Sequence, residues 1–234
     1  MADIINKYCA VIVAGGSGSR MKSDIPKQFL KIGSKTVLER SILAFEKSES
    51  IEGIVVVVSQ DYINDVKNIV TLCGFKKVIK VVGGGDTRQK SVYNGLLAVP
   101  ADYKYVLIHD GARPLLDEDI INNCILSLEN GKNCAPGVMV KDTLKIADGF
   151  SKINATPKRD NMYSIQTPQC FNLMDILYAH ENYKGSEVIT DDCMLMEQMG
   201  YDVYIVGGNY DNIKITTPED LTLAEFILNK RGIL

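Results

Sequence analysis

Six short apolar runs recur along the 234 residues of the chain, and a turn or a polar segment follows each of them. Within each run the residues are almost continuously apolar, which is typical of parallel strands covered on both faces. The runs occupy residues 9–16, 53–59, 77–85, 104–111, 133–140 and 201–208. They predict six strands of one buried sheet.

Helical signals separate these runs. Thr36 and Glu39 have the spacing of a capping box, and an apolar stripe with helical spacing follows them. Asp61 is placed to cap a second helix, and Thr217 followed by Pro218 predicts the start of another. Alternating strands and helices form βαβ units with right-handed crossovers. The predicted fold class is α/β: a doubly wound, mostly parallel sheet in a Rossmann-like sandwich.

Residues 140–168 break this rhythm, because no helical period runs through them. Two short alternating pieces, "DTLKI" and "FSKINAT", flank Asp148 and Gly149. An Asp-Gly pair between two alternating runs is a hairpin signal. We therefore expect a projecting β-arm at residues 140–168, inserted into a single domain that spans residues 1–234.

Composition narrows the class of protein. The chain is 46% hydrophobic and 24% charged, with a net charge of −3, which is ordinary for a globular protein and argues against a nucleic-acid binder. The six cysteines form no C-x-x-C pair, so they predict reduced thiols and a cytoplasmic location. We recognise no signal peptide and no apolar run long enough to span a membrane, so no membrane association is expected.

A glycine-rich loop follows the first predicted strand, in the segment "VAGGSGSRMKSDIPKQFLKIG" (residues 13–33). A loop at the carboxyl end of such a strand is placed to bind phosphate. The dinucleotide fingerprint G-x-G-x-x-G fails, because Met21 stands where its third glycine belongs, and the Walker spacing fails as well. The simpler alternative is a turn that only connects a strand to a helix.

Two cations accompany this loop. Arg20 and Lys27 flank Pro26, whose ring stiffens the path between them. Each alone is typical of a solvated surface charge, but the pair beside a glycine loop would neutralise a polyphosphate. The same pair would stabilise the charge of an in-line phosphoryl transition state.

Longer motifs then identify a family. The segments "PKQFL", "GGGDTRQKSV", "IHDGARP", "VKDTLK", "QTPQCF", "TDD" and "DNIKITTPEDLTLAE" lie in the order and spacing of the 2-C-methyl-D-erythritol 4-phosphate cytidylyltransferases, which are nucleotidyltransferases similar to sugar-nucleotide pyrophosphorylases. The resemblance covers residues 10–225. It implies the same α/β sandwich and a homodimer that interlocks through the β-arm.

The resemblance also implies a set of functional residues. It assigns catalysis to Arg20, Lys27, Arg159 and Lys214. It assigns CTP binding to Ala14, Gly15, Gly16, Ser17, Gly18 and Ser19 in the glycine loop, and to Gly85, Asp86 and Ser91, which recognise cytosine. It assigns substrate binding to Asp110, Arg113, Thr143, Arg159, Thr190, Asp211, Lys214 and Thr216. It implies Mg²⁺ as the cofactor, held largely by the CTP phosphates, and it assigns no protein ligand to the ion.

Structural explanations exist for several of these positions. The segment 83–91 also reads as a turn before a helix that begins near Ser91, and Thr190 to Asp192 as a helix N-cap. We interpret His109 as a structural histidine. The chain departs from the family pattern at Gly111, which replaces an alanine and should be tolerated, and at Pro157-Lys158, which replace the usual Val-Asp.

The implied reaction transfers CMP from CTP to 2-C-methyl-D-erythritol 4-phosphate and releases pyrophosphate. No side-chain general base is required, because the attacking phosphate is already anionic. Ribitol-5-phosphate cytidylyltransferase is the nearest alternative, since "RDNMYSIQTPQ" is similar to that branch. An NAD-binding oxidoreductase and a non-catalytic nucleotide sensor are alternatives from other classes.

Overall fold

The computed structural model describes residues 6–16 and 25–234. Its strands are β1 (Tyr8–Val13), β2 (Lys31–Ile32), β3 (Lys35–Thr36), β4 (Gly53–Val58), β5 (Val78–Gly83), β6 (Tyr105–Asp110), β7 (Asn133–Met139), β8 (Ile146–Ala147), β9 (Ile153–Ala155), β10 (Tyr163–Ile165), β11 (Gln169–Asn172) and β12 (Val203–Gly207). Its α-helices are α1 (Val37–Lys47), α2 (Ile63–Cys73), α3 (Arg88–Leu97), α4 (Glu118–Glu129), α5 (Leu173–Asn182), α6 (Asp192–Gln198) and α7 (Pro218–Lys230). Each of the six predicted strands is present.

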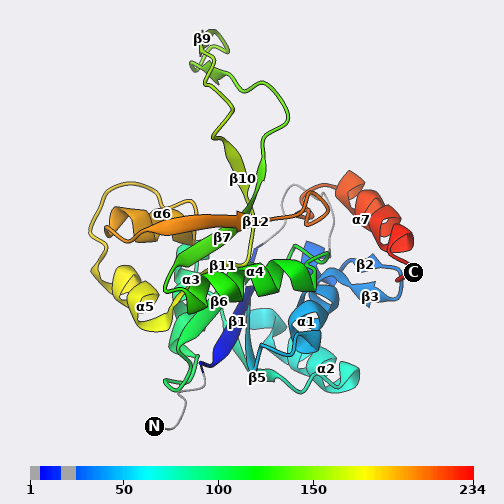
Figure 1. Cartoon of the computed structure of the whole chain (residues 1–234). Helices are drawn as coiled ribbons and strands as arrows, with labels where there is room; N and C mark the ends of the chain where they lie inside the picture. The colour runs from blue at the N-terminus through cyan, green and yellow to red at the C-terminus, as the bar shows by residue number, and fades with distance from the viewer. Residues whose placement is uncertain (1–5, 17–24) are drawn as a thin grey trace.

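The central sheet joins eight strands of the described chain, in the order β10-β7-β11-β6-β1-β4-β5, with β12 beside β7 (Figure 1). β1 pairs in parallel with β4 and β6, and β4 with β5. β11 runs antiparallel between β6 and β7. The prediction of a mostly parallel sheet is confirmed, whereas the four-residue strand β11 was not predicted because its apolar run is so short.

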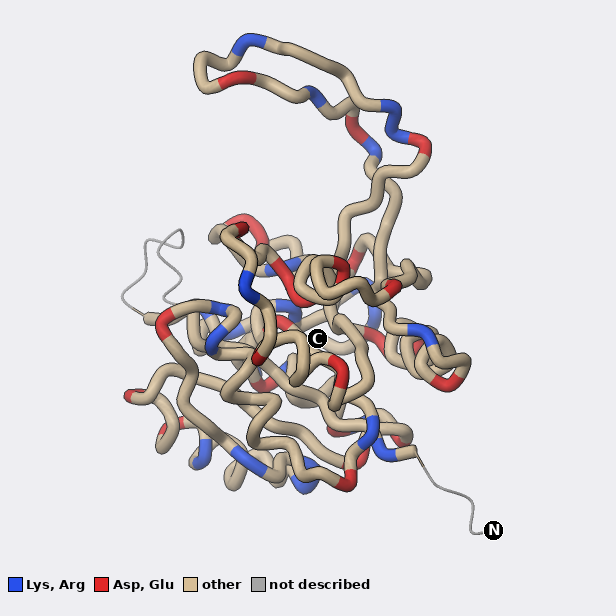
Figure 2. Tube along the Cα trace, turned by 90° about the vertical axis from the view of Figure 1, so that its left-hand side faces the viewer, with Lys and Arg blue, Asp and Glu red and all other residues tan. Residues whose placement is uncertain are grey.

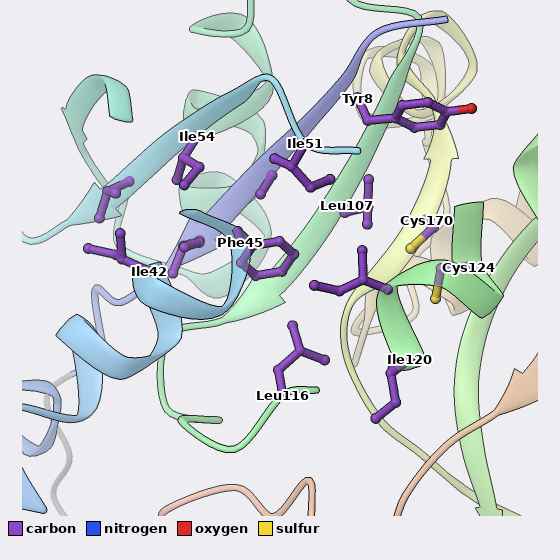
Figure 3. Close-up of a cluster of buried hydrophobic side chains, with 14 of the residues drawn as sticks. Tyr8, Ile42, Phe45, Ile51, Ile54, Leu107, Leu116, Ile120, Cys124 and Cys170 are labelled. Atoms are coloured by element: carbon purple, nitrogen blue, oxygen red, sulfur yellow. The ribbon is translucent and has the colours of Figure 1, made fainter. Parts of the chain in front are cut away.

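Hydrophobic side chains fill both faces of this sheet, because successive residues of a strand point to opposite sides. On one face, α1, α2 and α4 pack over Ala10 and Ile12 of β1. On the other face, α3, α5 and α6 pack over Cys9 and Val11. Phe45 of α1 is fully buried in the first layer (Figure 3). The doubly wound arrangement is thus confirmed.

Helix starts follow the sequence signals in two of three cases. The capping box of Thr36 and Glu39 is present, and so is that of Thr217 and Asp220. The prediction that Asp61 caps α2 is wrong: a 3₁₀ turn over Gln60–Tyr62 precedes the helix and moves its start beyond that carboxylate. α3 begins at Arg88, earlier than expected, because Thr87 caps it.

The arm extends far from the body of the molecule (Figures 1 and 2). Antiparallel pairing of β8 with β9 confirms the hairpin. Its turn is not a glycine turn: the Asp148 side chain accepts hydrogen bonds from the Phe150 and Lys152 amides, and the left-handed residue is Ser151 (φ 64°), not Gly149.

At the root of the arm, β10 pairs with β7, and the Val140 amide donates to the Met162 carbonyl at 3.0 Å. Among the described residues, no helix combines the length and the apolar character needed to cross a membrane.

Candidate active site

A cavity of about 420 Å³ opens where the chain leaves β1 and β6 at their carboxyl ends. Neighbouring parallel strands whose connections diverge leave such a crevice for ligands. The lining residues are Val13, Ala14, Gly15, Gly16, Lys27, Gln28, Gly85, Asp86, Thr87, Arg88, Ser91, Asp110, Gly111, Ala112 and Lys214. This set contains predicted residues from four separate motifs of the sequence.

The glycine loop enters the cavity directly from β1. The Ala14 amide donates to the Val57 carbonyl at 2.7 Å, and the Ser59 hydroxyl donates to the Gly15 carbonyl at 3.1 Å. These bonds fix the first turn of the loop against β4. Residues 17–24 lie outside the described part of the chain, so the predictions for Ser17, Gly18, Ser19 and Arg20 lie outside it too.

Gly111 brings the other wall close to this loop. Its amide donates to the Val13 carbonyl at 2.8 Å. A Cβ atom at this position would lie 2.8 Å from the Cβ of Ala14, closer than real Cβ contacts allow. The two walls therefore approach more closely here than an alanine at position 111 would permit without movement.

A second loop, from Gly83 to Thr87, forms the opposite rim. Ser91 holds it in shape: its hydroxyl accepts from the Gly85 amide at 3.0 Å and lies 2.8 Å from the Thr87 carbonyl oxygen. Ser91 itself is buried, whereas Gly85 and Asp86 are exposed at the rim. The rim thus presents the Asp86 carboxylate and the Gly85 backbone at the edge of the cavity, and Ser91 orders that backbone from behind.

Asp110 and Lys214 form the electrostatic centre of the cavity. The Lys214 Nζ lies 2.7 Å from Asp110 Oδ2, and Arg88 Nε lies 3.5 Å from Oδ1. Burial alone would raise the pKa of Asp110, but the Arg88 and Lys214 cations outweigh it and hold that pKa well below its usual range. Asp110 is therefore ionised and keeps the Lys214 ammonium in the cavity.

Lys27 supplies a second cation to the same space. It lines the cavity on a 3₁₀ turn over Lys27–Phe29 that follows Pro26. Its Nζ donates to the Ile215 carbonyl at 3.2 Å, in the segment that also carries Lys214. The two lysines thus reach one cavity, although they lie 187 residues apart in the sequence.

Arg88 is a site residue that sequence reasoning missed. Its guanidinium bridges Asp110 and the fully buried Asp192, with Nη2 2.9 Å from Asp192 Oδ2. Burial raises the pKa of Asp192, and the Arg88 charge partly offsets this. One signal was available: a cation in the first turn of a helix opposes the helix dipole and needs a local anion.

His109 is a core residue, as we interpreted it. It is fully buried against the edge of Phe45, with ring centroids 5.2 Å apart. Its ring nitrogens lie 3.0 Å from the Thr167 hydroxyl oxygen and 3.1 Å from the Arg113 carbonyl oxygen. Burial lowers the pKa of His109 to about 4, so the imidazole is neutral near pH 7.

Four predicted substrate residues of the body, Arg113, Thr190, Asp211 and Thr216, do not line the cavity. The Arg113 guanidinium lies behind Asp110 and donates to the Asn212 carbonyl at 2.7 Å. Asp211 pairs with the guanidinium of Arg231. The Thr216 hydroxyl donates to Asp220 at 2.8 Å, and the exposed Thr190 precedes α6, whose N-cap is Asp191.

Thr143 and Arg159 lie on the arm, and both are exposed. Arg159 Nη1 donates to the Lys141 carbonyl at 2.7 Å, within the arm itself. Figure 2 shows the charged residues of the arm well separated from the body of the same chain. The structure thus brings together Ala14–Gly16, the rim, Asp110, Lys27 and Lys214, and it leaves the arm positions apart.

Comparison with known proteins decides the family. The sequence profile of 2-C-methyl-D-erythritol 4-phosphate cytidylyltransferase (IspD) matches residues 8–230. The chain belongs to this family. A Clostridium botulinum protein of that name is 47% identical over 227 residues, covering 97% of this chain and 99% of that protein. One from Alkaliphilus oremlandii is 45% identical over 230 residues, covering 97% of each.

Solved structures agree with this family assignment. A crystal structure of 4-diphosphocytidyl-2C-methyl-D-erythritol synthase from Anaerococcus prevotii superposes with a TM-score of 0.85 at 33% identity, covering 96% of this chain and 99% of that one. The Thermus thermophilus cytidylyltransferase gives a TM-score of 0.74 at 27% identity, covering 94% and 98%. The family resemblance therefore extends through the whole sheet and its helices.

Proposed function

We propose that the chain transfers CMP from CTP to 2-C-methyl-D-erythritol 4-phosphate and releases pyrophosphate, a step of the non-mevalonate isoprenoid pathway. The observation that carries this is the cavity beyond β1, where the glycine loop, Lys27 and Lys214 converge. Membership of the cytidylyltransferase family supports CTP as the co-substrate. The names of the relatives favour the methylerythritol substrate over ribitol 5-phosphate.

The lysines explain how such a cavity would promote the reaction. A phosphate monoester attacking the α-phosphorus of CTP brings two anions together, so cations must compensate their repulsion. In our proposal Lys214 holds the attacking phosphate while Lys27, with Arg20, stabilises the charge on the α-phosphorus. Asp110 positions the Lys214 ammonium beforehand, which saves reorganisation during the reaction.

Cytosine recognition falls to the rim. The exposed Asp86 carboxylate and the backbone of Gly85 offer acceptors for the exocyclic amino group of the base. Ser91 acts indirectly in this proposal, because its hydroxyl is already used in holding the Gly85 backbone. The Ala14–Gly16 backbone leaves room for the triphosphate, since a Cβ atom at Gly16 would meet no atom of the described residues within 4 Å.

Mg²⁺ fits this site chiefly as a partner of CTP. The described carboxylates of the cavity are Asp86 and Asp110, and Lys214 and Arg88 already compensate the charge of Asp110. Mg²⁺ commonly binds through one or two carboxylates plus substrate phosphates. Asp86 is assigned to the cytosine end of CTP, so we propose that the phosphates hold the ion and that it neutralises their charge.

The arm supplies the remaining residues in our proposal, but to the cavity of a second subunit. Arg159 and Thr143 stand on a segment that projects from its own body, and Phe150 and Ile153 expose apolar surface there. Such surface on an isolated arm favours a partner chain. A homodimer would place these residues beside the bound sugar phosphate.

Mixing two inactive variants tests this arrangement. Arg159→Ala damages only the arm, and Lys214→Ala damages only the cavity. When they are co-refolded, a site built in trans gives each mixed dimer one cavity with two intact halves, so activity returns. If arm and cavity of the same chain cooperate, mixing restores nothing, and the interlocked dimer is wrong.

The activity itself is tested by pyrophosphate release with CTP and Mg²⁺. We expect turnover with methylerythritol phosphate and much weaker turnover with ribitol 5-phosphate. A preference for ribitol phosphate would move the chain to that alternative, and no turnover with either would overturn the proposal. Lys27→Ala distinguishes an enzyme from a nucleotide sensor, because only an enzyme has a kcat to lose; Lys31→Ala, an exposed lysine of β2, is the matched control.

Two further observations bear on the remaining alternatives. An NAD-binding protein would carry an acid after its second strand for the ribose, whereas Ser59 occupies that position and bonds to Gly15. All six cysteines are free thiols, which supports a reducing compartment, and we propose the cytoplasm.

A further inference from the structure

Three cysteine side chains meet inside the core, apart from the cavity. Cys124 lies on α4, Cys134 on β7 and Cys170 on β11, and their sulfur atoms all lie within 4.8 Å of one another. All three are fully buried, and Cys134 and Cys170 are direct partners in the sheet. Figure 3 shows the sulfur atoms of Cys124 and Cys170 close together. We call these three residues the thiol cluster.

We propose that the thiol cluster binds one soft, thiolate-preferring cation in three-coordinate geometry, with Cu(I) as the physiological member of this class. A metal–sulfur bond of about 2.3 Å places three sulfur ligands about 4.0 Å apart around a central ion. The present spacing lies within 4.8 Å, so the ligands need to close in by less than about 1 Å. Rotation about the Cα–Cβ bonds and small shifts of α4 suffice for that.

The donor set selects a soft ion. Among the described His, Cys, Asp and Glu residues, only these three sulfur atoms form the group. Sulfur alone does not suit Mg²⁺ or Ca²⁺, which take oxygen ligands. A structural zinc site needs four ligands, and the group offers three. Soft thiolates select Cu(I), which is also satisfied by low coordination numbers.

The surroundings favour an ion of low charge. The thiol cluster belongs to the hydrophobic core layer that contains Ile120 and Leu128. Burial of net charge in such a layer is costly. A monovalent cation bound by one thiolate and two thiols is neutral, and each further proton lost adds one negative charge. Cu(I) therefore reaches a neutral site after the loss of one thiol proton, whereas a divalent ion needs the loss of two.

The chemistry of binding balances without an added reagent. For each thiol that binds as a thiolate, one S–H bond breaks, one metal–sulfur bond forms, and the proton passes to the solvent. Neither sulfur nor metal changes oxidation state. The hydrogen bonds that the thiols give up are weak, among them those from Cys134 to the Cys124 carbonyl at 3.6 Å and from Cys170 to the Pro168 carbonyl at 3.5 Å.

A bound ion would connect a helix to the sheet. It would tie α4 to the neighbouring strands β7 and β11, where the sheet changes from parallel to antiparallel. Two other buried thiols, Cys9 and Cys193, lie in the opposite core layer and outside the thiol cluster. Both are buried, and neither belongs to a group of three potential ligands among the described residues, so they provide controls.

The test is a competition for copper. The reduced full-length chain is refolded under anaerobic conditions with Cu(I), which is then titrated with a chromophoric Cu(I) chelator. We expect one ion per chain, and a loss of affinity of at least about 100-fold in Cys124→Ala, Cys134→Ala and Cys170→Ala. Cys193→Ala should retain the wild-type affinity. Because Cu(I) is present during refolding, slow entry of the ion into the folded core does not limit binding.

Thermal unfolding gives an independent reading. Cu(I) that binds the native thiol cluster raises the Tm of the wild type but not of Cys134→Ser. Serine preserves the size of the side chain, so this variant serves if the alanine variant fails to fold. A lowered Tm would mean that the ion prefers unfolded thiols. That result, an absence of copper uptake, or an equal loss in Cys193→Ala would overturn the proposal. None of these readings depends on cytidylyl transfer.

Discussion

In the body of the molecule, Asp110 and Lys214 lie 2.7 Å apart in a cavity whose walls are fixed by backbone hydrogen bonds. In the arm, Thr143 and Arg159 are exposed, and Arg159 donates a hydrogen bond to the nearby Lys141 carbonyl, within the arm itself. The body therefore has its half of the proposed site preorganised. The arm residues, in our proposal, take up their positions only on the surface of a second subunit.

This difference has an energetic side. The body surrounds its aromatic and aliphatic side chains with two helix layers, whereas the arm leaves Phe150 94% exposed. Substitutions of equal chemistry should thus have very different effects in the two regions. Four experiments measure this contrast, from the largest expected effect to the smallest.

Phe45→Ala should lower the free energy of unfolding by about 3–5 kcal/mol, because it opens a cavity in a fully buried layer. Phe150→Ala should change it by less than about 0.5 kcal/mol in the separated subunit. Urea denaturation of both variants checks the contrast. Comparable losses would show that the arm folds back onto the body in solution.

Acidification should destabilise the body through its histidines, and the arm contains neither of the two that the chain has. Burial lowers the pKa of His109 and of His180 to about 4. The folded state therefore favours the neutral imidazoles. Their contribution to stability is complete above the unfolded pKa of about 6.5, and it is lost as the pH falls from there toward 4.

We expect a decrease of the order of a few kcal/mol between pH 7 and pH 4, measured by urea unfolding across that range. Imidazole resonances in NMR spectra identify the source. Both rings should still be neutral at pH 6, and a ring that titrates near 6.5 would remove that histidine from the explanation.

Gly111→Ala should cost about 1–3 kcal/mol and raise the KM for CTP, because its Cβ atom would lie 2.8 Å from that of Ala14. Gly149→Ala is the matched change in the arm, where a Cβ atom meets nothing within 4 Å. It should leave the free energy of unfolding within about 0.5–1 kcal/mol of the wild type. The KM for CTP, expressed as a free energy, should stay within the same range. Chemical denaturation and CTP titration of the pair give both numbers.

Ser151→Gly should have the smallest effect. Ser151 adopts φ 64°, a left-handed conformation that costs a non-glycine residue about 1 kcal/mol. Glycine relieves that cost but increases the entropy of the unfolded chain, so a gain below about 0.5 kcal/mol is expected. Amide hydrogen exchange in the β8–β9 hairpin measures this gain, which appears as slower exchange. Ser164→Gly, in the extended strand β10, is the control and should not slow exchange in the hairpin.

The sequence carried the fold further than the site. Six apolar runs correctly predicted six strands, because buried parallel strands leave a strong local pattern. β11 escaped prediction, since its four residues owe their position to β6 and β7 on either side. Asp61 was wrong as a cap for a similar reason: the 3₁₀ turn before α2 depends on the Tyr62 amide reaching the Ser59 carbonyl.

Site residues from separate motifs could be grouped only through the family resemblance, because the convergence of Lys27 and Lys214 is a tertiary property. Arg88 was missed because its partner Asp192 lies 104 residues further along the chain. Thr216 and Asp211 were predicted to contact substrate, yet the structure shows them bonded to Asp220 and Arg231. Their substrate roles stay predictions.

The root of the arm separates the projecting segment from the part of the chain that shapes the cavity. Hydrogen bonding between Val140 and Met162 closes the arm at its base, while Thr167, just beyond β10, bonds to the Asp110 amide under the cavity. Changes beyond the base therefore leave the register of the sheet and the cavity floor alone. Residues between Val140 and Met162 can therefore vary in length and charge without disturbing the fold of the body, apart from Thr143 and Arg159, to which our proposal assigns substrate contacts.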